Sequence, residues 1–257
     1  MEHWGPPTQL IINSKLKNKP GDLAEGMNNF FIGKVKDLQN RIPPSDCDPL
    51  KHVKKLMKNR KCKFELRSLY PSEVEKIIMN LKSTHSCGTD NIDSYILKLA
   101  CQELLPVITH IINISIKQKL FPSPWKTAKV IPLHKKDERT EPKNYRPVAL
   151  LAITSKILKR TIFNHLIEYL ETNDLLHPSH HGFRKNHSTA SALLQMNHSW
   201  IEALEDKEIT AVIMLDMSAA FDLVDSSLLI QKLKYYGLQD CATSWLTSYL
   251  TDRQQCV

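Results

Sequence analysis

The chain has 257 residues, of which 42% are hydrophobic, and this composition excludes a disordered polypeptide and allows a substantial core. Its formal net charge of +8 favours an acidic partner, most often nucleic acid or a membrane surface. The six cysteines show no Cys-x-x-Cys spacing, so the sequence indicates neither a zinc knuckle nor a disulfide framework.

The first 66 residues are expected to form a connector or extension before the main domain, which we place at 67–257. Within the connector, residues 22–42 have the apolar spacing of a helix, and the Pro-rich stretch 43–49 interrupts the pattern. Residues 51–67 then carry eight Lys or Arg against one Glu. Such a run is either a nucleic-acid contact or a solvated helix face, and the sequence leaves both open.

The middle of the chain predicts a helix followed by a turn and a second, long helix. Residues 71–82 have helical spacing, with Ser72 and Glu75 as a capping box at the start. The stretch CGTDNI, residues 87–92, has the composition of a turn, and the helix after it is expected to stop at Pro122. Its most apolar part, residues 104–120, is interrupted by polar residues and Pro106, so we expect neither membrane spanning nor secretion.

Residues 125–151 predict two strands around a basic, polar loop, because the short apolar runs Val130–Ile131 and 148–151 are separated by turn residues. Two amphipathic helices are expected next, at 155–173 and 188–206. The run of β-branched and aliphatic residues at 210–215 predicts a strand buried on both faces, ending at the carboxylate of Asp216. Two further helices are expected at 226–236 and 240–251, divided by Gly237. The predicted fold class is therefore α+β and rich in helices.

A carboxylate at the rim of a sheet is a suitable ligand for the divalent metals used in nucleotidyl transfer. Asp216 is also compatible with three different roles: a helix N-cap, the acid of a P-loop NTPase, or the nucleophile of a phosphatase with an Asp-x-Asp strand end. The sequence lacks the Gly-rich phosphate loop that a P-loop NTPase requires. The phosphatase role requires an acid at the position that Ser218 occupies. The two following acids are weaker candidates for a metal ligand: Asp225 is expected to be a helix N-cap rather than a ligand, and Asp222 to serve the backbone turn.

The string LDMSAAFDLVD, residues 215–225, resembles the motif of reverse transcriptases of non-LTR, LINE-like retrotransposons in which the first Asp is a catalytic metal ligand. Three upstream strings agree with this family in order and spacing, at 87–92, 125–162 and 180–194. The helical stretch in the connector also resembles the segment between the endonuclease and polymerase regions of such polyproteins. The resemblance implies a right-hand polymerase fold, here with a connector, the fingers and the first part of the palm.

The resemblance assigns roles to individual residues of the acidic motif. Asp216 would coordinate both catalytic Mg²⁺ ions, with the backbone carbonyl of Met217 as a second ligand. Phe221 would lie under the sugar of the incoming deoxynucleotide and reject a 2′-hydroxyl, although its spacing alone also fits a packed core residue.

The loop 134–146 resembles the fingers hairpin that covers the nucleotide triphosphate. A triphosphate is best bound by a guanidinium fork and the point charge of a lysine. Arg146 is the candidate for the fork, and Lys135 or Lys136 for the ammonium group, whereas Arg184 would position the template backbone.

The family places a second acidic hairpin, with paired aspartates, downstream of the residues present here, and no Asp-Asp pair occurs among the 257 residues. We therefore expect an RNA-directed DNA polymerase fragment without the thumb, using an RNA template, a DNA primer, dNTPs and Mg²⁺, with negligible activity in isolation. A non-catalytic nucleic-acid-binding remnant is the second hypothesis, and a helical interaction protein without a nucleic-acid partner is the third. The family suggests a cytoplasmic protein with access to the nucleus.

Overall fold

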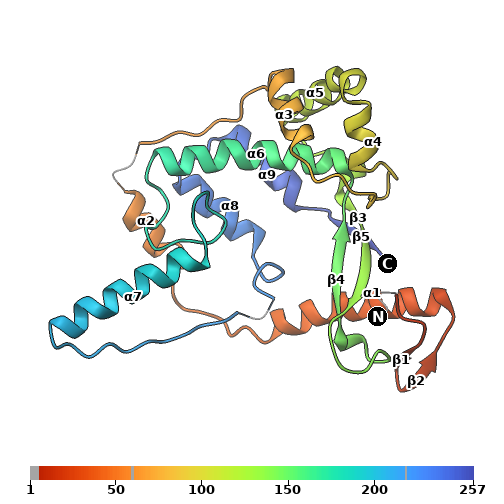
Figure 1. Cartoon of the computed structure of the whole chain (residues 1–257), viewed down its shortest axis with the longest axis horizontal. Helices are drawn as coiled ribbons and strands as arrows, with labels where there is room; N and C mark the ends of the chain where they lie inside the picture. The colour runs from red at the N-terminus through yellow and green to blue at the C-terminus, as the bar shows by residue number, and fades with distance from the viewer. Residues whose placement is uncertain (1–5, 59–60, 218) are drawn as a thin grey trace. The chain divides into compact units, whose positions relative to one another are not determined.

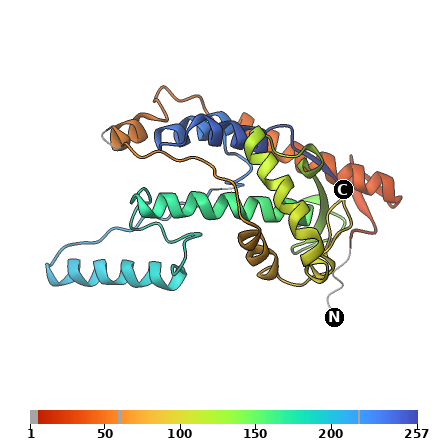
Figure 2. The same ribbon diagram turned by 90° about the horizontal axis from the view of Figure 1, so that it is seen from above.

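The computed structural model describes residues 6–58, 61–217 and 219–257 (Figures 1 and 2). These residues divide into two compact units. Unit 1 runs to His165 and resumes at Phe221, and unit 2 is Leu166–Ala220. The helices are α1 Pro20–Asn40, α2 Lys51–Met57, α3 Pro71–Met79, α4 Ser94–Leu99, α5 Cys101–Gln118, α6 Ile153–Thr172, α7 Thr189–Glu205, α8 Ser226–Tyr235 and α9 Asp240–Leu250. The strands are β1 Leu10–Ile12, β2 Lys15–Lys17, β3 Thr127–His134, β4 Tyr145–Leu150 and β5 Gln254–Cys256, and 3-10 turns occupy Ser123–Lys126 and Pro142–Asn144.

The main sheet of unit 1 has the order β4-β3-β5. The two strands predicted around the basic loop are confirmed as the antiparallel pair β3 and β4, in a register that sets Ile131 opposite Val148. Strand β5 pairs in parallel with the other edge of β3, from Thr127 opposite Gln254. Its three residues are too few to show an alternating pattern, so the sequence did not predict it. The mixture of helices and sheet agrees with the predicted α+β class.

The helix predicted in the connector is confirmed as α1, and it shares a core with the hairpin of β3 and β4. Leu23, Met27 and Phe31, four residues apart and therefore on one helix face, are buried together with Val130 and Tyr145. Leu10 of β1 completes this cluster. The extension is thus packed against the hairpin rather than separate from it.

The helix predicted at 71–82 is confirmed as α3, but its capping residues are not the predicted pair Ser72 and Glu75. The N-cap is Tyr70, whose backbone N–H donates to Glu73 Oε2 at 2.9 Å. Glu73 also accepts two hydrogen bonds from the guanidinium of Arg67, at 3.0 and 2.6 Å. The prediction was wrong because Pro71 occupies the first helical position, which moves the cap two residues toward the N-terminus of the chain.

The hydrogen bonds from the Arg67 guanidinium, together with the one from the Tyr70 N–H, lower the pKa of Glu73 to about 2, from its ordinary value of 4.5. A lowered carboxyl pKa contributes stability that is present above pH 4.5 and is lost as the pH falls toward 2. We expect Glu73→Gln to lower the free energy of unfolding at pH 7 by about 1 kcal/mol. Urea unfolding at pH 7 and pH 3 should show a smaller pH-dependent loss in Glu73→Gln than in the wild type. Glu25→Gln, an exposed change in α1, is the control, and equal effects of the two variants would contradict the assignment.

The long helix predicted before Pro122 is two helices, α4 and α5, which meet at Ala100 with φ −97° and ψ 25°. The hydrophobic spacing continues across this break, which is why the sequence did not reveal it. Helix α5 ends at Lys119 in the left-handed conformation, before the predicted stop at Pro122. Helices α8 and α9 are confirmed, and Gly237 between them has the positive φ of 94° that favours glycine.

Helix α9 is attached to α5 by a deeply buried aromatic side chain of unit 1, Trp245, which is 1% exposed. Its indole N–H donates to Ser115 Oγ at 2.9 Å. The ring lies against Phe121 edge to face and stacks on Tyr249, with centroid separations of 5.7 Å in both cases.

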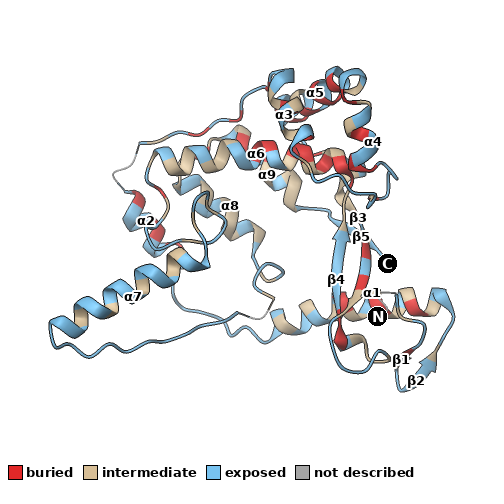
Figure 3. Ribbon diagram, in the orientation of Figure 1, coloured by how far each residue is buried: buried red, intermediate tan, exposed pale blue. Residues whose placement is uncertain are grey.

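Unit 2 has few buried residues (Figure 3). It contains the end of α6, the predicted helix α7 and the segment that follows α7. Ser188 caps α7 by accepting the backbone N–H of Ser191, and no described residue of α7 is fully buried. The loop before it is fastened by His181, whose ring nitrogens contact Ser191 Oγ at 2.9 Å and Gln195 Oε1 at 2.6 Å.

The predicted strand at 210–215 was wrong. In the described residues, 208–217 have no strand hydrogen bonding, and Ile213, Met214 and Leu215 are each at least 84% exposed. An apolar run shows that a segment can form a strand, but the strand forms only where a neighbour accepts its hydrogen bonds and covers its side chains. No described strand pairs with this segment.

Among the described residues, none of the helices combines the length and the apolar character needed to cross a lipid bilayer.

Candidate functional site

The hairpin of β3 and β4 presents one exposed, basic face. On β3 the side chains of Ala128, Val130 and Pro132 are buried, whereas Lys129 and Ile131 between them are exposed. Alternation along a strand therefore directs one face into the core and the other outward. Arg146 of β4 lies opposite Leu133, on the outward face.

The turn of this hairpin brings two of the predicted nucleotide-binding residues close together. Lys135 donates its backbone N–H to Asn144 O at 2.8 Å, which continues the antiparallel pairing by one step beyond β3. Arg146 pairs with Leu133, so Lys135, two residues after Leu133, lies diagonally across the hairpin from Arg146. Lys136 follows in the turn, and all three basic side chains lie at the surface.

Side chains of the strand ends fasten the connecting loop, 135–144. The Tyr145 hydroxyl donates to Arg139 O at 2.8 Å, and the Asn144 amide donates to Glu138 O at 2.8 Å. The His134 ring contacts Asp137 O at 2.9 Å and lies edge to face on Tyr145. Burial raises the pKa of Tyr145, so its hydroxyl remains a donor at neutral pH. These residues were not predicted from the sequence, although a Tyr and an Asn at the end of a polar loop were a usable signal.

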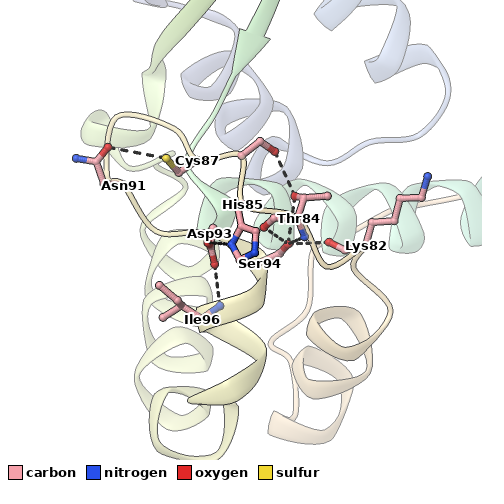
Figure 4. A network of polar contacts seen from close by, with 9 residues as sticks. Lys82, Thr84, His85, Cys87, Asn91, Asp93, Ser94 and Ile96 are labelled. Atoms are coloured by element: carbon pink, nitrogen blue, oxygen red, sulfur yellow. Dashed lines mark hydrogen bonds and ion pairs between the residues drawn. The ribbon is translucent and has the colours of Figure 1, made fainter.

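A second ordered loop carries the CGTDNI motif and lies beside the start of α6 (Figure 4). Ser94 Oγ donates to Lys82 O at 2.7 Å and accepts the Thr84 N–H at 2.9 Å. Asp93 accepts the Ile96 N–H at 2.7 Å and contacts His85 Nδ1 at 2.8 Å. The Ile96 N–H, followed by His85, lowers the pKa of Asp93.

Gly88 in this loop has no room for a side chain. A Cβ atom at Gly88 would lie 2.4 Å from the backbone nitrogen of Ala152 and 2.6 Å from the carbonyl carbon of Leu151. The backbone of the loop therefore contacts the backbone between β4 and α6 directly, which only glycine permits.

The acidic motif is exposed and is divided between the two units. Asp216 and Met217 lie in the extended end of unit 2, and both side chains are exposed. Phe221 is the first residue of unit 1 after the boundary and is 79% exposed. Ser218 of the motif lies outside the described residues.

The predicted N-cap role of Asp225 is confirmed. Its carboxylate accepts the backbone N–H groups of Ser227 at 2.7 Å and Leu228 at 3.0 Å, and thereby starts α8. The Leu228 N–H, followed by the Ser227 hydroxyl and N–H, lowers the pKa of Asp225. Asp222 lies in the turn before this helix.

Arg184 is placed in an internal interaction. Its Nε lies 3.5 Å from Glu171 Oε1, and its side chain is only 17% exposed. The residue therefore joins the loop after α6 to the end of that helix within unit 2.

The described residues do not by themselves fit a two-metal site. Reverse transcriptases generally use divalent metals, and a two-metal site requires several carboxylates in one place. No group of three or more His, Cys, Asp or Glu side chains with metal-binding geometry occurs in the described part of the chain.

Comparisons with known proteins agree with the motifs. Residues 133–256 match the family model described as reverse transcriptase (RNA-dependent DNA polymerase). The chain is 33% identical over 194 residues to the probable RNA-directed DNA polymerase from transposon BS of Drosophila melanogaster, covering 72% of this chain and 21% of the relative. It is 28% identical over 203 residues to the RNA-directed DNA polymerase from mobile element jockey of the same organism, covering 77% and 22%.

A third relative, the probable RNA-directed DNA polymerase from transposon X-element of Drosophila melanogaster, is 31% identical over 195 residues, covering 73% of this chain and 21% of the relative. The chain thus spans about a fifth of the length of the curated relatives that it matches. These matches, with the motifs at 87–92 and 215–225 and the basic hairpin between them, support the identification of the chain as part of a reverse transcriptase of the LINE-like, non-LTR retrotransposons.

Proposed function

We propose that this chain supplies the nucleotide-binding part of an RNA-directed DNA polymerase, which joins dNTPs to a DNA primer on an RNA template. The observation that carries the proposal is the outward face of the β3–β4 hairpin, where Arg146 lies opposite Leu133 and Lys135 begins the loop, all within the matched family segment 133–256. Residues 1–66 would form a connector or extension with one helix, and residues 67–257 the polymerase part. The family suggests that the polymerase works in the cytoplasm with access to the nucleus.

The chemistry of the hairpin suits a triphosphate. Arg146 offers a planar fork of donors that can bind two phosphate oxygens at once, and Lys135 or Lys136 offers a compact positive charge. None of the three forms an ion pair with a carboxylate in the described part of the chain. The loop is fastened by Asn144 and Tyr145, so little ordering of the backbone would be needed on binding.

The remaining residues are proposed from the family pattern. Asp216 would contribute one carboxylate toward Mg²⁺, with the carbonyl of Met217 beside it, and Phe221 would discriminate against a 2′-hydroxyl. Arg184 would support the template indirectly, because its guanidinium is engaged with Glu171.

For this chain alone, a non-catalytic nucleic-acid-binding role is the second candidate. It is favoured by the exposure of Asp216 and by the lack of a carboxylate cluster among the described residues. We expect negligible primer extension by the purified chain. Robust Mg²⁺-dependent extension that is lost in Asp216→Asn would show that the chain is catalytic as it stands.

The nucleotide-binding role is tested by photo-crosslinking of radiolabelled dTTP to the purified chain. Since a hydrogen bond to a charged group contributes about 1.5 to 3 kcal/mol, we expect Arg146→Ala to weaken dTTP binding by at least about tenfold. Arg41→Ala removes an exposed arginine after α1 and should leave binding unchanged. Equal dTTP binding by the wild type and Arg146→Ala would contradict the proposed role of the hairpin in nucleotide binding.

A further inference from the structure

Helices α2 and α8 lie side by side in unit 1, although about 175 residues separate them in the chain (Figures 1 and 2). They carry lysines and no Asp or Glu within their bounds. Their proximity brings the basic run of the connector near Lys232 of α8, which belongs to the otherwise acidic C-terminal part of the chain.

Helix α2 has one apolar face and one basic face. Val53 and Met57, four residues apart, are buried, and the side chains of Lys51, Lys55 and the C-capping Lys58 are exposed. At about 100° per residue, these three lysines lie within one arc of about 60°, opposite the buried pair. The apolar face is used for packing, and the basic face is left to solvent.

Contacts with α8 extend this basic face. Lys54 Nζ lies 5.8 Å from the centre of the Tyr235 ring and pairs with Asp48 at 2.7 Å. Lys232 is three residues before Tyr235, and residues three apart are neighbours on a helix surface. The surface of α2 therefore continues through Tyr235 to Lys232.

A third segment adds two more charges. Phe64 forms a parallel bridge with Leu238, through its N–H to Gly237 O at 2.9 Å and its carbonyl to the Gln239 N–H at 3.0 Å. This bridge fixes residues 61–64 beside the turn that follows α8. Lys61 and Lys63 are exposed there, while Phe64 is buried.

We call the resulting set the α2–α8 basic surface. It consists of Lys51, Lys55, Lys58, Lys61, Lys63 and Lys232. In the described part of the chain, no carboxylate forms an ion pair with any of these six, since the nearby Asp48 is taken by Lys54.

Stabilisation of the helices does not explain this arrangement. Lysines in the last turn of a helix are favourable to its dipole, which accounts for Lys232 and Lys234 in α8. Lys51 lies at the first position of α2, where a positive charge is unfavourable. Six like charges without counter-ions also repel one another, so their gathering costs stability that a polyanion would offset.

We propose that the α2–α8 basic surface is a second nucleic-acid contact of this chain, distinct from the hairpin, and that it binds the phosphate backbone without reading sequence. The inference rests on the proposed function only for the identity of the polyanion. A lipid surface is disfavoured because the apolar face of α2 is already buried in the protein, so the helix has no face left to insert.

The test uses the complete 257-residue chain with the triple change Lys51→Gln, Lys55→Gln and Lys58→Gln. Binding to a single-stranded RNA of about 20 nucleotides is measured by fluorescence anisotropy between about 50 and 300 mM KCl, the range in which phosphate contacts are salt-sensitive. We expect at least about a tenfold loss of affinity at the lowest salt, and a salt slope that is smaller by about 2, since each lost phosphate contact on a single strand removes about 0.7. The same loss is expected on DNA of the same length, because backbone contacts carry no sequence information.

Two matched variants complete the design. Lys34→Gln, Lys36→Gln and Lys117→Gln removes three lysines of α1 and α5 and should leave the affinity and slope unchanged. The triple change to Arg at 51, 55 and 58 should retain wild-type binding. Equal losses in the two Gln triples, or no loss in either, would overturn the proposal, as would loss of binding to anionic phosphatidylserine vesicles with RNA binding unchanged.

Failure of this inference can be distinguished from failure of the proposed function. If the Gln triple at 51, 55 and 58 binds RNA normally while Arg146→Ala loses dTTP, the basic surface is not a contact and the hairpin assignment stands. If the triple loses RNA while Arg146→Ala keeps dTTP, the surface is a contact and the hairpin assignment fails.

Discussion

Replacing Trp245 by Ala should lower the free energy of unfolding by about 3 to 5 kcal/mol, the range for removing a large buried aromatic side chain. Trp245 is 1% exposed, so nearly all of its ring is withdrawn from water. The change would leave a cavity between α5 and α9, remove the ring contacts with Phe121 and Tyr249, and leave Ser115 without its indole donor. Because small domains are stable by about 5 to 15 kcal/mol, this is a large share of the total.

Urea unfolding followed by far-UV circular dichroism measures the effect without depending on tryptophan fluorescence. Trp245→Phe should cost less than Trp245→Ala, since it keeps most of the buried area and loses the N–H donor. Trp200→Ala changes a half-buried tryptophan of α7, where no described residue is fully buried, and should have a much smaller effect. A loss below about 1 kcal/mol for Trp245→Ala would show that α9 is not held by this side chain.

Gly88→Ala should destabilise the chain by about 1 to 3 kcal/mol, the usual cost of forcing extra volume into a packed site. The new methyl group would lie within 2.6 Å of backbone atoms of Leu151 and Ala152, which cannot turn away as a flexible side chain could. We expect the loop 82–93 to be displaced from the start of α6, with loss of the contacts around Ser94.

Gly33→Ala is the matched control, because Gly33 lies inside α1 and an added Cβ would meet nothing within 4 Å. There the same substitution should raise the free energy of unfolding by about 0.5 to 1 kcal/mol, as alanine favours helix over glycine. Opposite signs for the two variants, from urea midpoints, would confirm the close approach at Gly88. A stabilising effect of both would contradict it.

Much of the secondary structure was predictable because it depends on local patterns. The spacing of Leu23, Met27 and Phe31 predicted a helix in the connector, and Val130–Ile131 and the run at 148–151 predicted the two strands of the hairpin. Asp225 was predictable as a cap because its carboxylate satisfies N–H groups only two and three residues away. Where a nearby residue changed the local geometry, as Pro71 did at the start of α3, the prediction was wrong by two residues.

The candidate site was predictable in part. The motif indicated Asp216, Met217 and Phe221, and the loop indicated Lys135, Lys136 and Arg146, but the roles of these residues remain predictions. The side chains that fasten the loop, Asn144 and Tyr145, were missed: their residue types at the end of a polar loop were a usable signal, but their partners are backbone carbonyl groups, which the sequence does not identify.

The sequence by itself determined which segments are amphipathic, where turns interrupt them and which family the motifs resemble, because each of these depends on residues that are neighbours along the chain. The tertiary structure alone decided that β5 pairs with β3, that α8 lies beside α2, and that the apolar segment before Asp216 is exposed. Pairing, burial and the summed field of distant charges depend on which segments meet in space. A local pattern indicates which secondary structure a segment can form, whereas the segments that contact it in space determine which structure it forms and whether it is buried.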